Sequence, residues 1–169
     1  MPGRSPTNAP MDKKPLFAAL LTQLNEELAI VKSAAAAARE GATHEEAKPE
    51  NQYDTRALEQ SYLAGAQTAR AESLSQAVAS VELFEPPALG PDDPIRVGAA
   101  VVVDDGQEVR RYLLCDFGGG TKMKVGEQRW WVITPGSPLG RALVGRRVGD
   151  VIERRVRKEE ISLEVIEVY

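Results

Sequence analysis

The residues best suited to do chemistry gather in one short acidic window of the 169-residue chain. Residues 40–54 contain a single lysine, Lys48, and five carboxylates, which are Glu40, Glu45, Glu46, Glu50 and Asp54. Carboxylate oxygens are ligands that Mg²⁺ accepts, usually one or two for each ion. In phosphodiester hydrolysis a second metal ion stabilises the attacking and leaving oxygens. This window could therefore hold Mg²⁺ for phosphodiester cleavage, although acidic residues also favour helix N-termini and charge runs are usually solvated.

The sequence gives little support to other kinds of catalytic or metal site. His44 is the only histidine and Cys115 the only cysteine, so one chain cannot build a histidine metal site, a Ser/His triad, a disulfide or a cysteine zinc cluster. Cys115 follows two leucines and is expected to be a small buried hydrophobe. The Gly118–Gly120 run lacks the strand–GxxxxGK–helix context of a phosphate loop and is expected to be a mobile loop. No stably bound cofactor is expected.

The charge distribution narrows the range of partners. The chain has 21 Lys and Arg residues against 25 Asp and Glu residues, for a net charge of −4. Residues 1–90 carry 8 basic and 12 acidic side chains, whereas residues 91–169 carry 13 of each. An acidic chain is a poor candidate for direct binding to a phosphate backbone. No run of about 18 apolar residues predicts a membrane span, and the N-terminus lacks the apolar segment of a secretory signal, so a cytoplasmic location is expected.

Four segments must position these side chains. Residues 1–11 are rich in Pro, Gly, Ser and Asn and are expected to be disordered. Residues 12–84 have a strongly helical composition and predict a hairpin of two helices with its tip near 41–53. Residues 85–94 carry four prolines and predict a stiff linker. Residues 95–169 switch to β-branched residues and glycine turns, which predicts a small β-rich domain.

The helical segment has the apolar spacing of an antiparallel coiled coil. Its first half repeats apolar residues at alternating spacings of 4 and 3, namely Phe17, Leu21, Leu24, Leu28, Val31, Ala35 and Ala38. The second half predicts a less regular seam, formed by Leu63, Ala66, Leu74, Ala77, Val81 and Phe84. Arg70 interrupts this second seam, and its aliphatic stem is expected to cover the apolar stripe. In both halves small residues lie toward the turn, so the two helices match in size.

The C-terminal segment predicts five strands and one short helix. The expected strands are 95–103, 109–115, 130–133, 151–156 and 161–168, with an irregular loop at 116–126. Ser137 or Pro138 is expected to start a helix over 139–144 that ends at Gly145. Trp130 and Trp131 are adjacent on a strand, so one is expected in the core and the other outside, where it could contact a partner. The arginine clusters are expected to be solvated or to face an acidic protein surface or RNA.

The stretch SPLGRALVGRRVGDVIERRV at 137–156 resembles the C-terminal domain of the Gre transcript-cleavage factors, the GreA/GreB family of bacterial RNA polymerase. The residues that fall on the family pattern are Ser137, Pro138, Ala142, Leu143, Gly145, Gly149 and Asp150. The order of the chain, a hairpin followed by a linker and this domain, is also similar. The resemblance implies an α+β protein: an antiparallel coiled-coil hairpin followed by an FKBP-like antiparallel β-sheet domain with one short helix.

The resemblance also implies a function and a set of site residues. It implies a cytoplasmic, monomeric elongation factor that is not itself an enzyme and whose acidic tip enters the secondary channel of RNA polymerase. There Glu50 and Glu46, or less favourably Glu45 and Asp54, would help hold the polymerase's Mg²⁺ beside backtracked RNA. Glu50-Asn51 matches the Glu-Asn of the family tip, but Ala47 stands where the family has Asp. Ser137, Pro138, Arg141 and Trp131 are the residues expected to contact the polymerase.

Two other functions stay open at this point. A similar factor could occupy the channel and modulate or inhibit the polymerase without stimulating cleavage. An FKBP-type fold also suggests a peptidyl-prolyl isomerase or chaperone, which needs a concave apolar pocket lined by aromatic residues. The C-terminal segment offers only five aromatic residues for such a pocket, Tyr112, Phe117, Trp130, Trp131 and Tyr169. Since function resides in sites rather than in folds, the isomerase is the weaker alternative.

Overall fold

The computed structural model describes residues 11–43, 55–156 and 159–169, and within them three helices and six strands. Two compact units emerge. The first, here called the sheet unit, comprises Met1–Leu20 and Leu83–Tyr169, and the second, the helical arm, comprises Leu21–Glu82. The elements in chain order are α1 (Lys14–Thr43), α2 (Thr55–Leu83), β1 (Ala100–Asp104), β2 (Val109–Leu114), β3 (Lys122–Val125), β4 (Gln128–Ile133), α3 (Pro138–Leu143), β5 (Val151–Val156) and β6 (Glu159–Val168).

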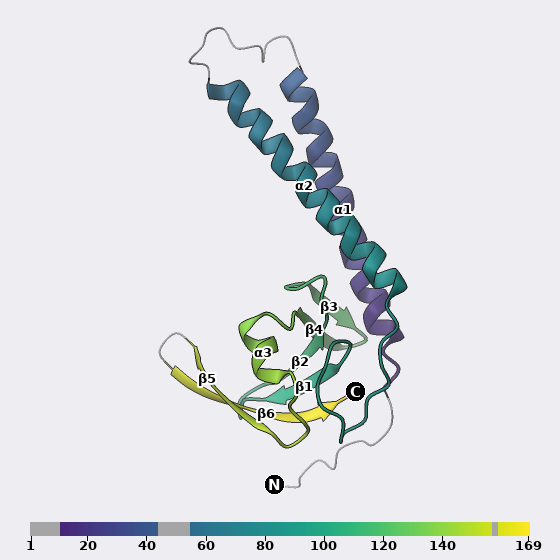
Figure 1. Cartoon of the computed structure of the whole chain (residues 1–169), viewed down its shortest axis with the longest axis vertical. Helices are drawn as coiled ribbons and strands as arrows, with labels where there is room; N and C mark the ends of the chain where they lie inside the picture. The colour runs from purple at the N-terminus through teal and green to yellow at the C-terminus, as the bar shows by residue number, and fades with distance from the viewer. Residues whose placement is uncertain (1–10, 44–54, 157–158) are drawn as a thin grey trace. The chain divides into compact units, whose positions relative to one another are not determined.

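The sheet unit is built on one six-stranded sheet with the strand order β3-β4-β2-β1-β6-β5 (Figure 1). All neighbouring strands are antiparallel except β2 and β4, which run parallel with Tyr112 opposite Trp131. The expectation of a fully antiparallel sheet is therefore corrected at this pair. The chain turns back twice between β2 and β4, and β3 takes the outer edge, so β4 returns beside β2 in the same direction. The predicted α+β class is confirmed, because the structure has a helix pair followed by a mostly antiparallel sheet with one short helix.

The core of the sheet unit lies between α3 and one face of the sheet. Val101 and Val103 alternate along β1 and are both fully buried, as expected for residues that share a face. Leu143 of α3 is fully buried in the same cluster. The remaining buried members are Leu89, Ile95, Ala99, Leu114, Ile152, Leu163, Val165 and Val168. Leu89 comes from the proline-rich segment, so that segment packs against the domain instead of merely leading to it.

Two strand boundaries differ from the sequence prediction. β1 begins at Ala100 and not at Ile95, because Gly98 adopts a φ of 89° and a turn closes between Ala99 N and Arg96 O at 2.9 Å. The predicted loop at 116–126 contains the short strand β3, which pairs with β4. Its sequence, Lys-Met-Lys-Val, alternates polar and apolar residues, and Met123 is buried opposite Trp130. A strand of four residues, in a segment bounded by Gly120 and Gly126, was too short a pattern to predict.

The seam predicted for α1 is present. Leu24, Leu28, Val31 and Ala35 are buried, and Leu21 and Ala38 are half-buried. Phe17 at the start of the seam is also buried, together with Leu16 and Leu20, which the prediction did not include. In the described residues neither α1 nor α2 is long and apolar enough to cross a membrane.

The seam predicted for α2 is correct only in its C-terminal half. Val81 is buried and Leu74 and Ala77 are half-buried, but Leu63 is 55% exposed and Ala66 is exposed. The less exposed positions farther from Val81 are instead Ala64, Gln67, Thr68 and Ala71. In this half of α2 the residues partly shielded from solvent are therefore small or polar, and the large apolar residue Leu63 is not among them. The shift also moves Arg70 off the seam, where it forms an exposed ion pair with Glu27 of α1 and does not cover an apolar stripe.

Candidate functional site

The acidic window lies mostly outside the described residues. This is true of Glu45, Glu46, Glu50 and Asp54, and of His44, so their predicted roles and the predicted Mg²⁺ contact stay predictions. Along the chain the window begins with Glu40 in the last turn of α1, which ends at Thr43, and its other residues precede the start of α2 at Thr55. Within residues 11–43, 55–156 and 159–169, no group of three or more His, Cys, Asp or Glu side chains could hold a metal ion.

The first part of the candidate site that the structure describes is an aromatic pair on the sheet. Trp130 is 1% exposed, whereas Trp131 is half-buried on the opposite face of β4, as the alternation of a strand predicts. The ring of Trp131 lies 6.2 Å from that of Tyr112, its partner on β2. Lys122 of β3 is paired with Trp131 from the other side and is exposed. An aromatic surface flanked by a cation therefore crosses three neighbouring strands.

The second part is the start of α3, where the sequence SPLG makes a tight cap. The Ser137 hydroxyl donates to Thr134 O at 2.7 Å and accepts from Gly140 N at 3.0 Å. Pro138 follows at the first helical position, where the missing N–H has no helical partner to lose. A Cβ on Gly140 would lie 1.9 Å from Thr134 O, so no side chain fits there. These contacts explain the residue types of the motif by local structure alone.

The cap occupies Ser137 but leaves two of its neighbours available. Pro138 and Arg141 are exposed, while Ser137 is half-buried with its hydroxyl engaged in the cap. The Arg141 guanidinium donates to the carbonyl of Gly136 and is held over the turn before α3. The Ser137 hydroxyl therefore stabilises the turn before α3, whereas the side chains of Pro138 and Arg141 are exposed and available to contact a partner.

The structure brings these two parts to the same face of the sheet. Tyr112 and Ile133 pack against the core cluster that contains Leu143 of α3. Trp131 precedes Ile133 by two residues on β4, so both side chains lie on the face that α3 covers. We call this surface the Trp131 face and define it by Tyr112, Trp131, Lys122, Pro138 and Arg141. Three of the four residues predicted to contact a partner, Trp131, Pro138 and Arg141, are part of this definition, and their role stays a prediction.

The burial of the cysteine and the loop conformation of the glycine run match the sequence predictions. Cys115 is fully buried, and burial raises the pKa of its thiol to about 11 from an ordinary value of 9.0. Gly118 and Gly120 have φ angles of 68° and 90°, in the region that glycine adopts most readily. Both observations describe packing and loop geometry and indicate no reactive centre.

The sequence analysis missed one side chain with unusual surroundings, Lys13. It is the only charged residue among the buried positions of the described chain, with 6% of its surface exposed. Its ammonium donates to the carbonyl oxygens of Pro87, Gly98 and Tyr169. Burial, and to a smaller extent the charge of Arg96, lowers its pKa to about 8. No sequence signal separates Lys13 from the exposed Lys14 beside it, because the acceptors are backbone atoms 74 to 156 residues away.

Comparison with known proteins shows sequence similarity to one family. Residues 90–169 match the family model described as transcription elongation factor, GreA/GreB, C-term. The chain is 27% identical over 130 residues to transcription elongation factor GreA of Thermomicrobium roseum, an alignment that covers 77% of each protein.

Solved structures of the same kind also resemble the chain. GreA factor homolog 1 of Thermus thermophilus is similar over 89% of this chain and 95% of its own, with 20% identity and a TM-score of 0.35. The prokaryotic transcription elongation factor GreA/GreB from Nitrosomonas europaea is similar over 57% of this chain and 78% of its own, with 20% identity and a TM-score of 0.34.

Proposed function

We propose that the chain is a member of the GreA/GreB family and an elongation factor of bacterial RNA polymerase, because residues 90–169 match the family model of the GreA/GreB C-terminal domain. In this proposal the sheet unit docks on the polymerase through the Trp131 face. The helical arm carries the acidic window into the secondary channel and promotes cleavage of backtracked RNA. The factor acts in the cytoplasm as a monomer and supplies side chains to the active site of another enzyme.

The family match of residues 90–169 is the observation that carries the proposal. Two features of the described residues support it. The Trp131 face combines a half-buried tryptophan, a tyrosine and exposed cations, and tryptophan, tyrosine and arginine are enriched at the centres of protein interfaces. α1 and α2 are 30 and 29 residues long, about 45 Å at 1.5 Å per residue, which is long enough to reach into a channel.

The proposed chemistry assigns a limited task to the chain. Mg²⁺ in the polymerase would activate water and stabilise the leaving oxygen of the RNA phosphate. Carboxylate oxygens suit this ion, so the donor set of Glu50 and Glu46 fits the task. These side chains would hold or orient the ion, and the nascent RNA would be contacted only indirectly. All other catalytic groups belong to the polymerase.

A transcript-cleavage assay on stalled, backtracked elongation complexes tests this proposal. Addition of the protein should shorten the RNA, and Glu50→Ala should lower the cleavage rate at least about tenfold because it removes an ion ligand. Glu46→Ala should have a smaller effect in the same direction. Glu72→Ala, which removes an exposed carboxylate from α2, is the matched control and should cleave like the unmodified protein. Full cleavage by a Glu46→Ala, Glu50→Ala double variant would contradict the assignment.

A second candidate function is favoured by Ala47, which stands where Gre tips carry Asp. A tip with one carboxylate fewer could occupy the channel and retune the polymerase without stimulating cleavage. In the same assay this regulator would bind the polymerase, leave backtracked RNA intact and compete with a cleaving Gre factor. Ala47→Asp should then create or raise the cleavage activity, and its failure to do so would count against this candidate.

Docking through the Trp131 face is tested separately by binding to core RNA polymerase. Trp131→Ala should raise the Kd at least about tenfold, because it removes the largest side chain of the proposed contact. Val151→Ala is a suitable control, since Val151 is 54% exposed but lies on β5, at the margin of the sheet distant from β4. Equal affinity of both variants would remove the Trp131 face from the proposal and leave the tip assignment untouched.

A further inference from the structure

Lys13 joins three segments of the sheet unit that are distant in the sequence. Its ammonium nitrogen lies 2.5 Å from Pro87 O, 2.8 Å from Gly98 O and 3.0 Å from Tyr169 O. These acceptors belong to the proline-rich segment, to the turn before β1 and to the residue after β6. An ammonium group has three hydrogens and no acceptor, so all of its hydrogen-bonding capacity is used.

The three carbonyls occupy places where backbone donors are scarce. Pro87 is preceded by Pro86 in a segment without secondary structure, and prolines have no N–H to donate. Gly98 sits at a φ of 89° in the turn that delays β1, and its own N–H donates to Leu114 O. Tyr169 O already accepts from Ala100 N at 3.0 Å, and the ammonium adds a second donor. Lys13 therefore supplies a donor to Pro87 O and Gly98 O and a second donor to Tyr169 O at one spot.

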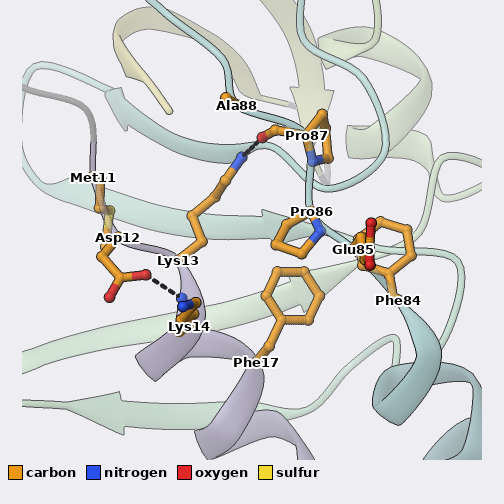
Figure 2. A pocket seen from close by; sticks show the side chains of 10 residues that line it. All are labelled: Met11, Asp12, Lys13, Lys14, Phe17, Phe84, Glu85, Pro86, Pro87 and Ala88. Atoms are coloured by element: carbon orange, nitrogen blue, oxygen red, sulfur yellow. Dashed lines mark hydrogen bonds between the residues drawn. The ribbon is translucent and has the colours of Figure 1, made fainter.

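Apolar contacts enclose the same spot. The rings of Phe17 and Phe84 stack with centroids 5.3 Å apart, and Phe84 meets Phe117 edge-on at 5.6 Å. A Cβ on Gly98 would come within 2.4 Å of Pro87 Cδ, so the backbone of this turn lies directly against the proline-rich segment. Figure 2 shows the Lys13 ammonium reaching Pro87 O, while Phe17 lies against Pro86 at the wall of a cavity of about 560 Å³.

We propose that Lys13 is a latch that makes the first turns of α1 a structural part of the sheet unit, and that the base of α1 opens as one piece when the latch is released. In the closed state the ammonium bridges α1, the proline-rich segment and the ends of β1 and β6. In the open state these segments lose their shared donor together, while α3 and the β5–β6 hairpin stay folded.

The hydrogen bonds of Lys13 show which residues the folded sheet unit includes beyond the matched family domain. The donor comes from residue 13, the acceptors come from residues 87, 98 and 169, and the matched family domain begins at residue 90. A fragment that starts at the family boundary would contain two acceptors without their donor. The structural unit therefore extends beyond the matched domain at both Lys13 and Pro87.

Amide hydrogen exchange of the full chain tests the latch, with Lys13→Met as the main variant. Methionine keeps most of the aliphatic stem and removes the three donors. We expect the amides of Gly98, Ala100 and Tyr169 to exchange at least about tenfold faster, with unchanged exchange at Arg141 and Val144 of the α3 region. Lys14→Met is the control, because Lys14 is the exposed neighbour, and it should exchange like the unmodified protein at all five amides.

Two outcomes would overturn the proposal. One is unchanged exchange at Gly98, Ala100 and Tyr169 in Lys13→Met. The other is an equal increase at these amides and at Arg141 and Val144, because this result would mean that Lys13 supports only global stability. If Lys13→Met does not fold, Lys13→Gln keeps two donors, and we expect a smaller increase confined to the same three amides. Uniform or absent acceleration in Lys13→Gln would equally overturn the latch.

Discussion

The two ends of α1 show how one helix is stabilised in two different ways. Near its start, Leu16 and Leu20 are fully buried, Phe17 is 8% exposed, and these residues belong to the sheet unit. Farther along, in the helical arm, the buried residues recur only every three or four positions, and Ile30 between them is 69% exposed. The base is thus held by contacts from distant segments, whereas the arm is held by one narrow seam.

This difference indicates that the helical arm and the sheet unit have different structural roles. A seam of small and medium-sized residues leaves most of the arm's surface free, which suits an element that must present side chains and not pack a core. The sheet unit buries large side chains from α1, the proline-rich segment, six strands and α3. A position on the base should therefore be far more sensitive to mutation than an exposed position of the same residue type.

The largest expected effect is that of Leu16→Ala on the sheet unit. Removing a fully buried leucine side chain should lower the free energy of unfolding by about 2–5 kcal/mol. Leu83→Ala is the matched control in the same unit, because Leu83 is 84% exposed and should change stability by less than about 0.5 kcal/mol. Both tryptophans of the chain, Trp130 and Trp131, lie in the sheet unit, so urea denaturation followed by tryptophan fluorescence measures this unit selectively.

Leu24→Ala sharpens the same comparison from the side of the arm. It should reduce the helical signal in circular dichroism at lower urea, because Leu24 is 1% exposed in the seam, and leave the tryptophan transition in place. A Leu16→Ala protein with an unchanged tryptophan transition would show that the base of α1 does not belong with the sheet.

The second prediction concerns the thiol of Cys115. With its pKa raised from 9.0 to about 11 by burial, it should contain about a hundredfold less thiolate at pH 8 than an ordinary cysteine. Labelling by iodoacetamide should be slower by a similar factor than in urea-unfolded protein. The pKa of the Cys115 thiol is higher in the folded than in the unfolded protein. The contribution of the neutral thiol to the free energy of unfolding is therefore complete below pH 9 and declines as the pH rises toward 11. Rapid labelling of the folded protein at pH 8 would contradict the burial of this side chain.

The third prediction concerns the turn that forms the Trp131 face. Gly140→Ala places a methyl group 1.9 Å from Thr134 O and should cost about 1–3 kcal/mol, because the backbone of the turn must move. Gly136→Ala, four residues earlier, meets no atom within 4 Å and is the control. Thermal denaturation measures both. Similar melting temperatures for the two variants would mean that the SPLG cap is not the tight turn described above.

The smallest effect is expected for the ion pair between Arg70 and Glu27. Both side chains are substantially exposed, at 61% and 38%, so a double-mutant cycle should give a coupling of about 0.2–1 kcal/mol. Arg70→Ala with Glu72→Ala replaces the partner by another exposed carboxylate of the same helix and should show smaller coupling. The coupling should shrink further at 1 M salt. A coupling above about 2 kcal/mol would mean that the arm depends on this pair more than on its seam.

Much of the fold was predictable because its signals are local. The spacing of Leu24, Leu28 and Val31 fixes a helix face, and Ser137-Pro138 with Gly145 marks both ends of α3. The errors share one physical origin. Leu63 was assigned to the seam of α2 because it is large and apolar, but burial also depends on the helix that faces it, and Ala64 and Gln67 lie closer to the interface.

In the candidate site, too, features set by local sequence were predicted and features set by distant residues were not. Trp131 was expected to face outward from strand alternation alone, and it does. The joining of Trp131 and α3 on one face required the parallel pairing of β2 with β4, which no local pattern specifies. Lys13 could not be recognised for a similar reason, because its acceptors are backbone carbonyls of distant residues, and a carbonyl of any residue type can accept from it. The roles of Glu46 and Glu50 remain predictions from the resemblance.

The order of the strands leaves β3 and β5 at the two margins of the sheet, where unpaired backbone groups could add a strand from another molecule. β3 carries Lys122 and Lys124 at alternate, exposed positions, and the β5 margin carries the exposed Arg155. Bringing two β3 margins together would place lysines beside lysines with little solvent between them, whereas the β5 margin carries the exposed Glu153 as well as Arg155. We therefore expect Lys122 and Lys124 to oppose aggregation of the protein through its β3 edge, even at high protein concentration.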